Sequence, residues 1–133
     1  MIWIVTVGNG RALIFKCHPV RPYLALVKKI LPETDSSGRT HSKSSALVER
    51  KIFETLAQEL KTSKEAGHFE HLIFAGSEAE VASLLDAMDT MTRSYVIGTI
   101  QKDMFQRPFS ELEEECFSII ESWLLHPKTG SYY

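Results

Sequence analysis

The sequence predicts an α/β fold in which a mixed five-stranded sheet carries helices on both faces. Residues 1–31 contain three successive runs rich in β-branched and aromatic side chains, separated by Gly, Asn and Pro. After residue 44 the apolar residues recur at steps of three and four, as in amphipathic helices. Helical patterns then alternate with two short apolar runs. The predicted order along the chain is β-β-β-α-β-α-β-α.

The three opening strands are joined by short turns. Residues 2–7 (IWIVTV) and 11–17 (RALIFKC) flank the sequence GNG, and an Asn-Gly pair between two such runs is a strong hairpin signal. Residues 23–31 (YLALVKKIL) form a third run, which follows a turn containing two prolines. We therefore expect an antiparallel meander.

Three helices and two inner strands complete the order. Residues 45–65 have the spacing of a helix that buries one face. The runs at 71–76 (HLIFAG) and 95–100 (YVIGTI) are apolar throughout, which is typical of strands covered on both faces. Two capping boxes, Ser77 to Glu80 and Ser110 to Glu113, predict where the later helices begin.

This order implies right-handed crossovers, which place helices on both sides of the sheet. It fits a ribonuclease-H-like architecture, which several components of the translation machinery share. We expect residues 1–126 to form a single domain and residues 127–133 a short tail.

Composition sets limits on location and partners. The net charge is −2, but residues 28–51 hold six basic and three acidic groups, so this segment is about +3. Cys17 and Cys116 match no metal or redox spacing and are expected to be buried thiols in a reducing compartment. The apolar start lacks the features of a signal peptide, and no apolar run approaches a bilayer-spanning length. The sequence predicts a soluble, cytoplasmic protein with no membrane partner.

The sequence carries no recognisable set of catalytic or metal-binding residues. A nuclease on this architecture needs carboxylates on the central strands to hold two Mg²⁺ ions, and the runs at 2–7, 71–76 and 95–100 contain none. There is no phosphate-binding glycine loop and no zinc spacing among the histidines. We therefore predict no cofactor, no metal and no catalytic residue, and favour a binding protein over an enzyme.

One connection remains a candidate for function. Lys102, Asp103 and Arg107 follow the run at 95–100, and loops at the carboxyl ends of buried strands often carry functional residues. An ordinary connection with an Asp-stabilised turn is the alternative reading. A small hydrolase that uses this loop, or the serines beside His41, is the least favoured function.

Three segments together resemble the bacterial host-attachment protein family: IWIVTVGNGRALIF, LKTSKEAGHFEHLIFAG and VIGTIQKDMFQRPFSELEE. The resemblance covers nearly the whole chain, and it differs at two points. Asn9 stands where the family usually has Asp, and the loop at 34–45 is shorter than the family's basic loop. The residues that carry the resemblance are Trp3, Gly10, Arg11, Ala12, Phe15, Gly67, Phe69, Leu72, Lys102, Asp103 and Leu112.

That family is similar to the middle domain of the eukaryotic class-1 release factor and its archaeal and bacterial relatives. In release factors, a basic loop ending in Gly-Gly-Gln-Ser-Ala-Leu leads into a long helix and enters the ribosomal peptidyl-transferase centre. Here Ser45-Ala46-Leu47 falls in the corresponding place, but Ser42-Lys43-Ser44 replaces Gly-Gly-Gln. The resemblance implies a release-factor-like module that does not hydrolyse peptidyl-tRNA by this mechanism.

The first hypothesis is therefore a non-catalytic module that binds the ribosome or tRNA. Its candidate contacts to nucleic acid are Arg39, His41, Lys43, Arg50 and Lys51. The alternative is an indirect contribution to the attachment of bacteria to host cells. The sequence also leaves open a homodimer, in which residues 2–7 and the tyrosines at 132 and 133 would pair between copies.

Overall fold

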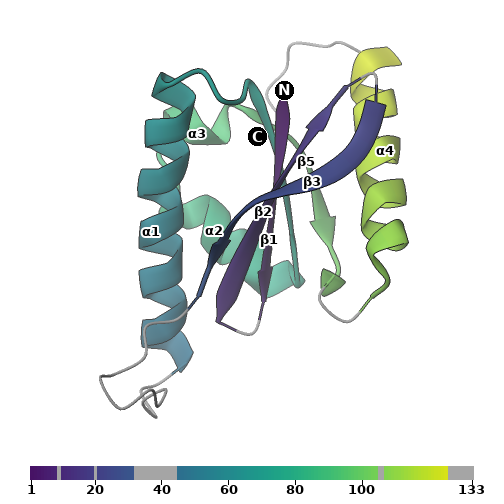
Figure 1. Ribbon diagram of the computed structural model, residues 1–133. Coiled ribbons are helices and arrows are strands. Elements are labelled where there is room, and N and C mark those ends of the chain that lie inside the picture. Colours follow the sequence, from purple (N-terminus) through teal and green to yellow (C-terminus); the bar gives the residue numbers. More distant parts are fainter. Residues whose placement is uncertain (9, 20, 32–44, 105–106, 126–133) are drawn as a thin grey trace.

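The computed structural model describes residues 1–8, 10–19, 21–31, 45–104 and 107–125. Among the described residues, five strands and three helices follow one another in the predicted order, and one short additional helix lies between the last two of the three (Figure 1). They are β1 (Ile2–Gly8), β2 (Arg11–His18), β3 (Arg21–Ile30), α1 (Ser45–Glu65), β4 (His71–Gly76), α2 (Glu78–Ala87), α3 (Thr90–Arg93), β5 (Val96–Gln101) and α4 (Phe109–Leu125).

The five strands form one mixed sheet with the order β3-β2-β1-β4-β5. β1, β2 and β3 pair antiparallel, whereas β4 and β5 run parallel to β1. The predicted fold class and the opening meander are therefore confirmed. Because β1 is hydrogen-bonded to a strand on each side, residues 2–7 are not available to pair with a second copy, so that route to a homodimer was wrong. Residues 132 and 133 lie outside the described residues.

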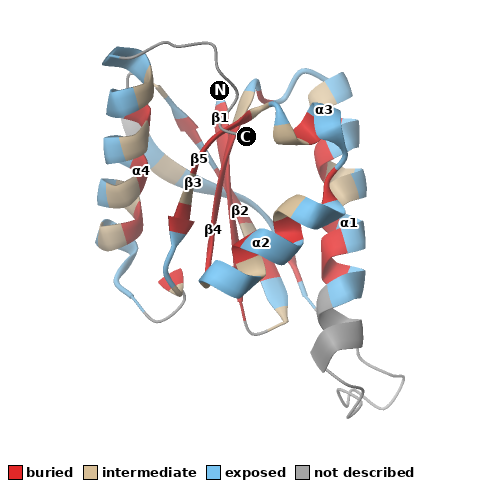
Figure 2. Ribbon diagram, turned by 180° about the vertical axis from the view of Figure 1, so that it is seen from behind, coloured by how far each residue is buried: buried red, intermediate tan, exposed pale blue. Residues whose placement is uncertain are grey.

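The sheet separates two apolar cores (Figure 2). On one face, alternate residues of β1 such as Trp3 and Val5 pack with α1 and α2. On the other face, Ile2 and Ile4 pack with the buried side of α4. We call these the α1 side and the α4 side of the sheet. Within the described residues, no helix is long and apolar enough to cross a bilayer.

A glycine follows the end of α1. The helix ends at Glu65, and Gly67 has a φ of 78°, a left-handed conformation that glycine adopts without strain. The N–H of His68 donates to the carbonyl of Ser63, which closes the last turn as in a Schellman motif.

One of the two predicted capping boxes is present. Ser77 and Glu80 exchange side-chain to backbone hydrogen bonds at the start of α2. The second prediction was wrong, because α4 already begins at Phe109 and Ser110 lies inside its first turn. Glu113 makes a distant contact instead, since its Oε2 accepts a hydrogen bond from the backbone N–H of Leu24 in β3, at 3.3 Å.

Two smaller differences also have local causes. α3 was not predicted, and it begins where the Asp89 carboxylate accepts a hydrogen bond from the N–H of Thr92, at 2.7 Å. This bond holds the pKa of Asp89 below its usual value. β3 starts at Arg21, earlier than predicted, and includes Pro22, which an edge strand tolerates because one row of its N–H groups has no ladder partner.

Both cysteines are free and buried in the core on the α4 side, as the sequence predicts. Burial raises the pKa of the Cys17 thiol to about 11 and also raises the pKa of Cys116. Both side chains therefore stay protonated near neutral pH and act as small apolar groups.

His71, at the start of β4, packs against Trp123 of α4 with ring centroids 4.4 Å apart. Burial lowers the pKa of His71 below its ordinary value of 6.5; Glu70 opposes this shift, whereas the amino terminus and Lys64 add to it. The unfolded chain therefore binds this proton more tightly than the folded chain does. The contribution of His71 to stability is complete above its unfolded pKa and is lost as the pH falls from there towards the folded value.

We expect His71→Phe to reduce the pH dependence of stability, because phenylalanine keeps a ring against Trp123 but does not titrate. The measurement is urea unfolding of both proteins above and below the unfolded pKa of histidine. The wild type should lose more free energy of unfolding on acidification than the variant does. Equal losses in the two proteins would show that His71 does not contribute.

Candidate nucleic-acid interface

The predicted nucleic-acid contacts fall at the beginning of α1. β3 and β1 run in the same direction, so the chain leaves β3 at the end of the sheet where β1, β4 and β5 also finish. Figure 1 shows that the first turns of α1 extend past this end of the strands. Arg50 and Lys51 are the sixth and seventh residues of α1 and are exposed. Arg39, His41 and Lys43 lie outside the described residues.

The electrostatics of Arg50 leave its charge accessible. Its Nε lies 3.8 Å from Oε1 of Glu54, one turn later, and the two side chains are 78% and 71% exposed. An exposed pair of this kind contributes little, because water and salt screen it. A phosphate can therefore replace Glu54 as the partner of Arg50 at small cost.

The connection after β5 has a different character. Lys102 Nζ lies 2.8 Å from Glu115 Oε2, and Arg107 Nη1 lies 2.7 Å from Glu111 Oε1. Both glutamates belong to α4, so these two basic groups fasten the connection to the helix that follows it. This geometry favours the structural reading of Lys102 and Arg107. Two glutamates of the acidic run at 113–115 therefore have structural partners, because Glu113 bonds the backbone of Leu24 and Glu115 pairs with Lys102.

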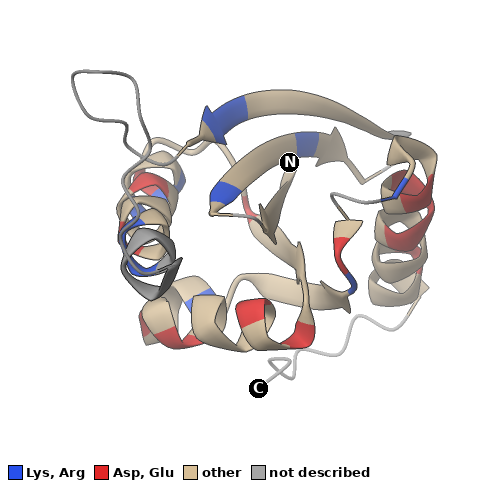
Figure 3. Cartoon of the chain, turned by 90° about the horizontal axis from the view of Figure 1, so that it is seen from below, with Lys and Arg blue, Asp and Glu red and all other residues tan. Residues whose placement is uncertain are grey.

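The structure does not bring the two candidate groups into one site. α1 covers one face of the sheet, whereas Lys102 and Arg107 bond to the helix on the other face. Figure 3, seen from the end where the parallel strands finish, shows these helices on opposite sides of the sheet. Asp103 follows β5 and is partly exposed.

The centre of the sheet holds no acidic side chain. β1, β4 and β5 are the three adjacent parallel strands, and their sequences IWIVTVG, HLIFAG and VIGTIQ contain neither Asp nor Glu. Among the residues that the structure describes, no three His, Cys, Asp or Glu side chains are grouped so that they could hold a metal ion. His68 and His71 do not pair, because His68 stacks on Trp3 and His71 contacts Trp123 on the other side of the sheet.

Sequence reasoning counted Lys28 and Lys29 in the charge of residues 28–51 but did not connect them with Lys16 on the neighbouring strand. Lys16 on β2, and Lys28 and Lys29 on β3, are exposed. Lys28 Nζ bonds Oε1 of Glu59 on α1. The signal was available in the sequence, because no Asp or Glu occurs before Glu33.

Comparison with known proteins assigns the chain to a family, which its geometry alone does not. Residues 28–116, from the end of β3 into α4, match the family model of bacterial archaeo-eukaryotic release factor family 12. The chain belongs to this family. Membership confirms the predicted kinship with release-factor relatives, and it covers the start of α1, where Arg50 and Lys51 lie.

Two solved structures share the fold of this family 12 chain. One is described as an archaeal protein, with a TM-score of 0.54, and the other is the archaeal translation termination factor aRF1, with a TM-score of 0.52. Each is 15% identical to the chain, and each match covers 95% of the chain and 40% of the other protein. The chain therefore corresponds to less than half of either archaeal protein. No curated protein matches it.

Proposed function

We propose that this chain is a non-catalytic binding module of the translation machinery, which contacts ribosomal RNA or tRNA through residues 39–51 at the start of α1. The observation that carries the proposal is the position of Arg50 and Lys51 on exposed early turns of a long helix in a release-factor family member. A cytoplasmic location and a single domain over residues 1–126 are parts of the same proposal.

The electrostatics support binding to phosphate. Arg50 and Lys51 occupy adjacent positions on α1, and the segment before the helix adds Arg39 and Lys43 in sequence. Clustered basic side chains bind nucleic acid by releasing condensed counterions, so the affinity falls steeply as salt rises. Residues 39–51 hold four Lys or Arg and one Glu, a balance that favours a polyanionic partner.

The chemistry of the chain supports binding without catalysis. Hydrolysis of phosphodiesters on this type of sheet requires inward carboxylates, and the parallel strands β1, β4 and β5 have none. In place of the Gly-Gly-Gln of release factors the chain has Ser42-Lys43-Ser44. Glycine permits backbone conformations that serine and lysine resist, so this segment is not suited to position a hydrolytic water.

The proposal is tested by titrating fluorescently labelled tRNA and by co-sedimentation with ribosomes over a range of salt concentrations. We expect Lys43→Glu, Arg50→Glu to weaken binding about tenfold or more and to make the dependence of log Kd on log salt shallower. Lys61→Glu is the matched control for Arg50→Glu, because Lys61 is also exposed on α1 but lies at its opposite end.

Two results would contradict the proposal. One is full retention of binding by the double variant, and the other is equal loss in Lys61→Glu, which would indicate only a net-charge effect. A peptidyl-tRNA release assay, run in parallel, should show no activity above the uncatalysed rate.

A further inference from the structure

The charges of the chain are divided unevenly along its sequence. Residues 1–32 contain five basic residues and no acidic one, so all 17 acidic residues lie later in the chain. β1 has no charged residue, and the five basic residues therefore belong to β2 and β3 at one edge of the sheet. Figure 3 shows Lys and Arg on these outer strands, with Asp and Glu mainly on the helices. In sequence, the five basic residues of β2 and β3 are Arg11, Lys16, Arg21, Lys28 and Lys29.

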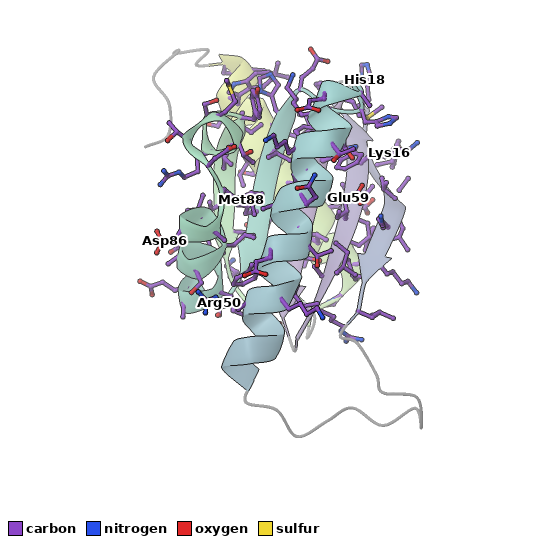
Figure 4. The ribbon with its side chains drawn as sticks, turned by 90° about the vertical axis from the view of Figure 1, so that its left-hand side faces the viewer. Lys16, His18, Arg50, Glu59, Asp86 and Met88 are labelled. Carbon is purple, nitrogen blue, oxygen red and sulfur yellow. The ribbon has the colours of Figure 1, made fainter. Side chains whose placement is uncertain are left out.

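Successive side chains of β2 point to opposite faces of the sheet, and this alternation gives the direction of its exposed side chains. Ile14 belongs to the core on the α1 side, whereas Phe15 and Cys17 belong to the core on the α4 side. Lys16 and His18 therefore point to the α1 side of the sheet, and both are exposed. Figure 4 shows them together beside the upper part of α1.

β3 adds Lys28 to the same side. It pairs in register with Ile14, and its Nζ lies 2.5 Å from Oε1 of Glu59 on α1. This hydrogen bond lowers the pKa of Glu59, so the carboxylate stays charged and offsets one of the lysines. Lys16 adds a second positive charge on this side, so Lys16, Lys28 and Glu59 together carry a net positive charge.

An exposed aromatic ring lies on the same strand. Tyr23 in β3 is 79% exposed, more than any other large apolar side chain that the structure describes. Its neighbour Leu24 packs against the core on the α4 side, so Tyr23 points to the α1 side, as Lys16 and Lys28 do. Exposed aromatic side chains among basic ones are typical of surfaces that bind single-stranded nucleic acid, because bases stack on the rings.

We infer that this surface, which we call the ribbon surface (Lys16, His18, Tyr23 and Lys28), binds single-stranded RNA. The lysines contact phosphates, and Tyr23 stacks against a base. The inference rests on the proposed function and adds a second contact to it. An acidic protein segment would also be attracted by the lysines, but its carboxylates would not stack on the exposed ring of Tyr23.

The ribbon surface is separate from the start of α1. Figure 4 shows Arg50 on the lower part of α1, whereas Lys16 and His18 lie beside its upper part. Arg50 and Glu59, the ion-pair partner of Lys28, are nine residues apart on the helix. At a rise of about 1.5 Å per residue the two places are roughly 13 Å apart, so variants can test them one at a time.

The experiment measures binding of a fluorescein-labelled single-stranded oligouridylate to the full chain by anisotropy, at several salt concentrations. Tyr23→Ala should weaken binding about fivefold or more, whereas Tyr23→Phe should bind as the wild type does. Lys16→Glu should weaken binding about three- to tenfold and reduce the slope of log Kd against log salt by about 0.7. Lys61→Glu is the charge-matched control, and circular dichroism confirms that each variant is folded.

The outcomes separate the two proposals. If Arg50→Glu weakens binding but Tyr23→Ala and Lys16→Glu do not, the inference is overturned and the proposed function stands. If only the ribbon variants weaken binding, the inference stands and the role of the start of α1 fails. If none of these variants weakens binding, or if Lys61→Glu weakens it equally, both fail. Equally strong competition by poly-glutamate would assign the surface to an acidic protein segment and overturn the RNA assignment.

Discussion

Replacing Phe74 with alanine is expected to lower the free energy of unfolding by about 3–5 kcal/mol, the largest loss among the substitutions considered. Phe74 lies in β4 between Val5 of β1 and Thr99 of β5, and its side chain is fully buried in the core on the α1 side. The surrounding strands and helices cannot close around the space that the ring leaves. The loss therefore includes both the transfer of the ring to water and the remaining cavity.

The matched control for this prediction is Phe117→Ala. Phe117 lies on α4 and is 47% exposed, so the same change of side chain removes much less buried area. Urea unfolding followed by circular dichroism gives both values, and the control should lose less than half as much as Phe74→Ala. Similar losses in the two variants would mean that the side chain of Phe74 is not packed in the core on the α1 side.

Gly98→Ala is expected to destabilise the fold by about 1–3 kcal/mol through overpacking. Gly98 lies in β5, and an added Cβ would stand only 2.6 Å from Cγ2 of Ile119 on α4. Removing a glycine also restricts the unfolded chain, which stabilises proteins by about 0.4–1 kcal/mol, so the clash is the larger of the two effects. Because Ile119 is β-branched, its Cγ2 cannot move aside without leaving its preferred rotamer.

A double variant separates overpacking from a backbone effect. Gly98→Ala combined with Ile119→Ala removes the clashing methyl group, so the added Cβ should cost less in this background than in the wild type. Urea unfolding of the four proteins gives the coupling between the two positions. If Gly98→Ala costs the same in both backgrounds, close packing of α4 on β5 is not the reason for the glycine.

Local patterns in the sequence were sufficient for most of the fold. The strands were predicted from β-branched and apolar runs, and α1 from its apolar spacing. The start of α4 was predicted wrongly, because Ser110 and Glu113 have the spacing of a capping box. Glu113 instead accepts a hydrogen bond from Leu24, 89 residues earlier in the chain. Such a contact cannot be predicted from the residues around Glu113.

The candidate site was predicted less completely. The charge count drew attention to residues 28–51, and the structure describes Arg50 and Lys51 there on exposed turns of α1. A charge count does not show pairing, and so it did not reveal that Lys102 is held by Glu115 of α4. Nor did it reveal the basic side of β2 and β3, which depends on the alternation of two paired strands.

The hydrogen bond between Glu113 and Leu24 affects how the chain behaves at high concentration. An outermost strand can recruit a strand from another molecule, and this growth leads towards aggregation or amyloid. Here α4 supplies a carboxylate to an amide of β3, so an incoming strand would have to displace a negative charge at that point. The carboxylate of Glu113 on α4 therefore contributes to colloidal stability. Because this charge comes from the helix, β3 can keep an apolar and basic sequence without acidic residues of its own.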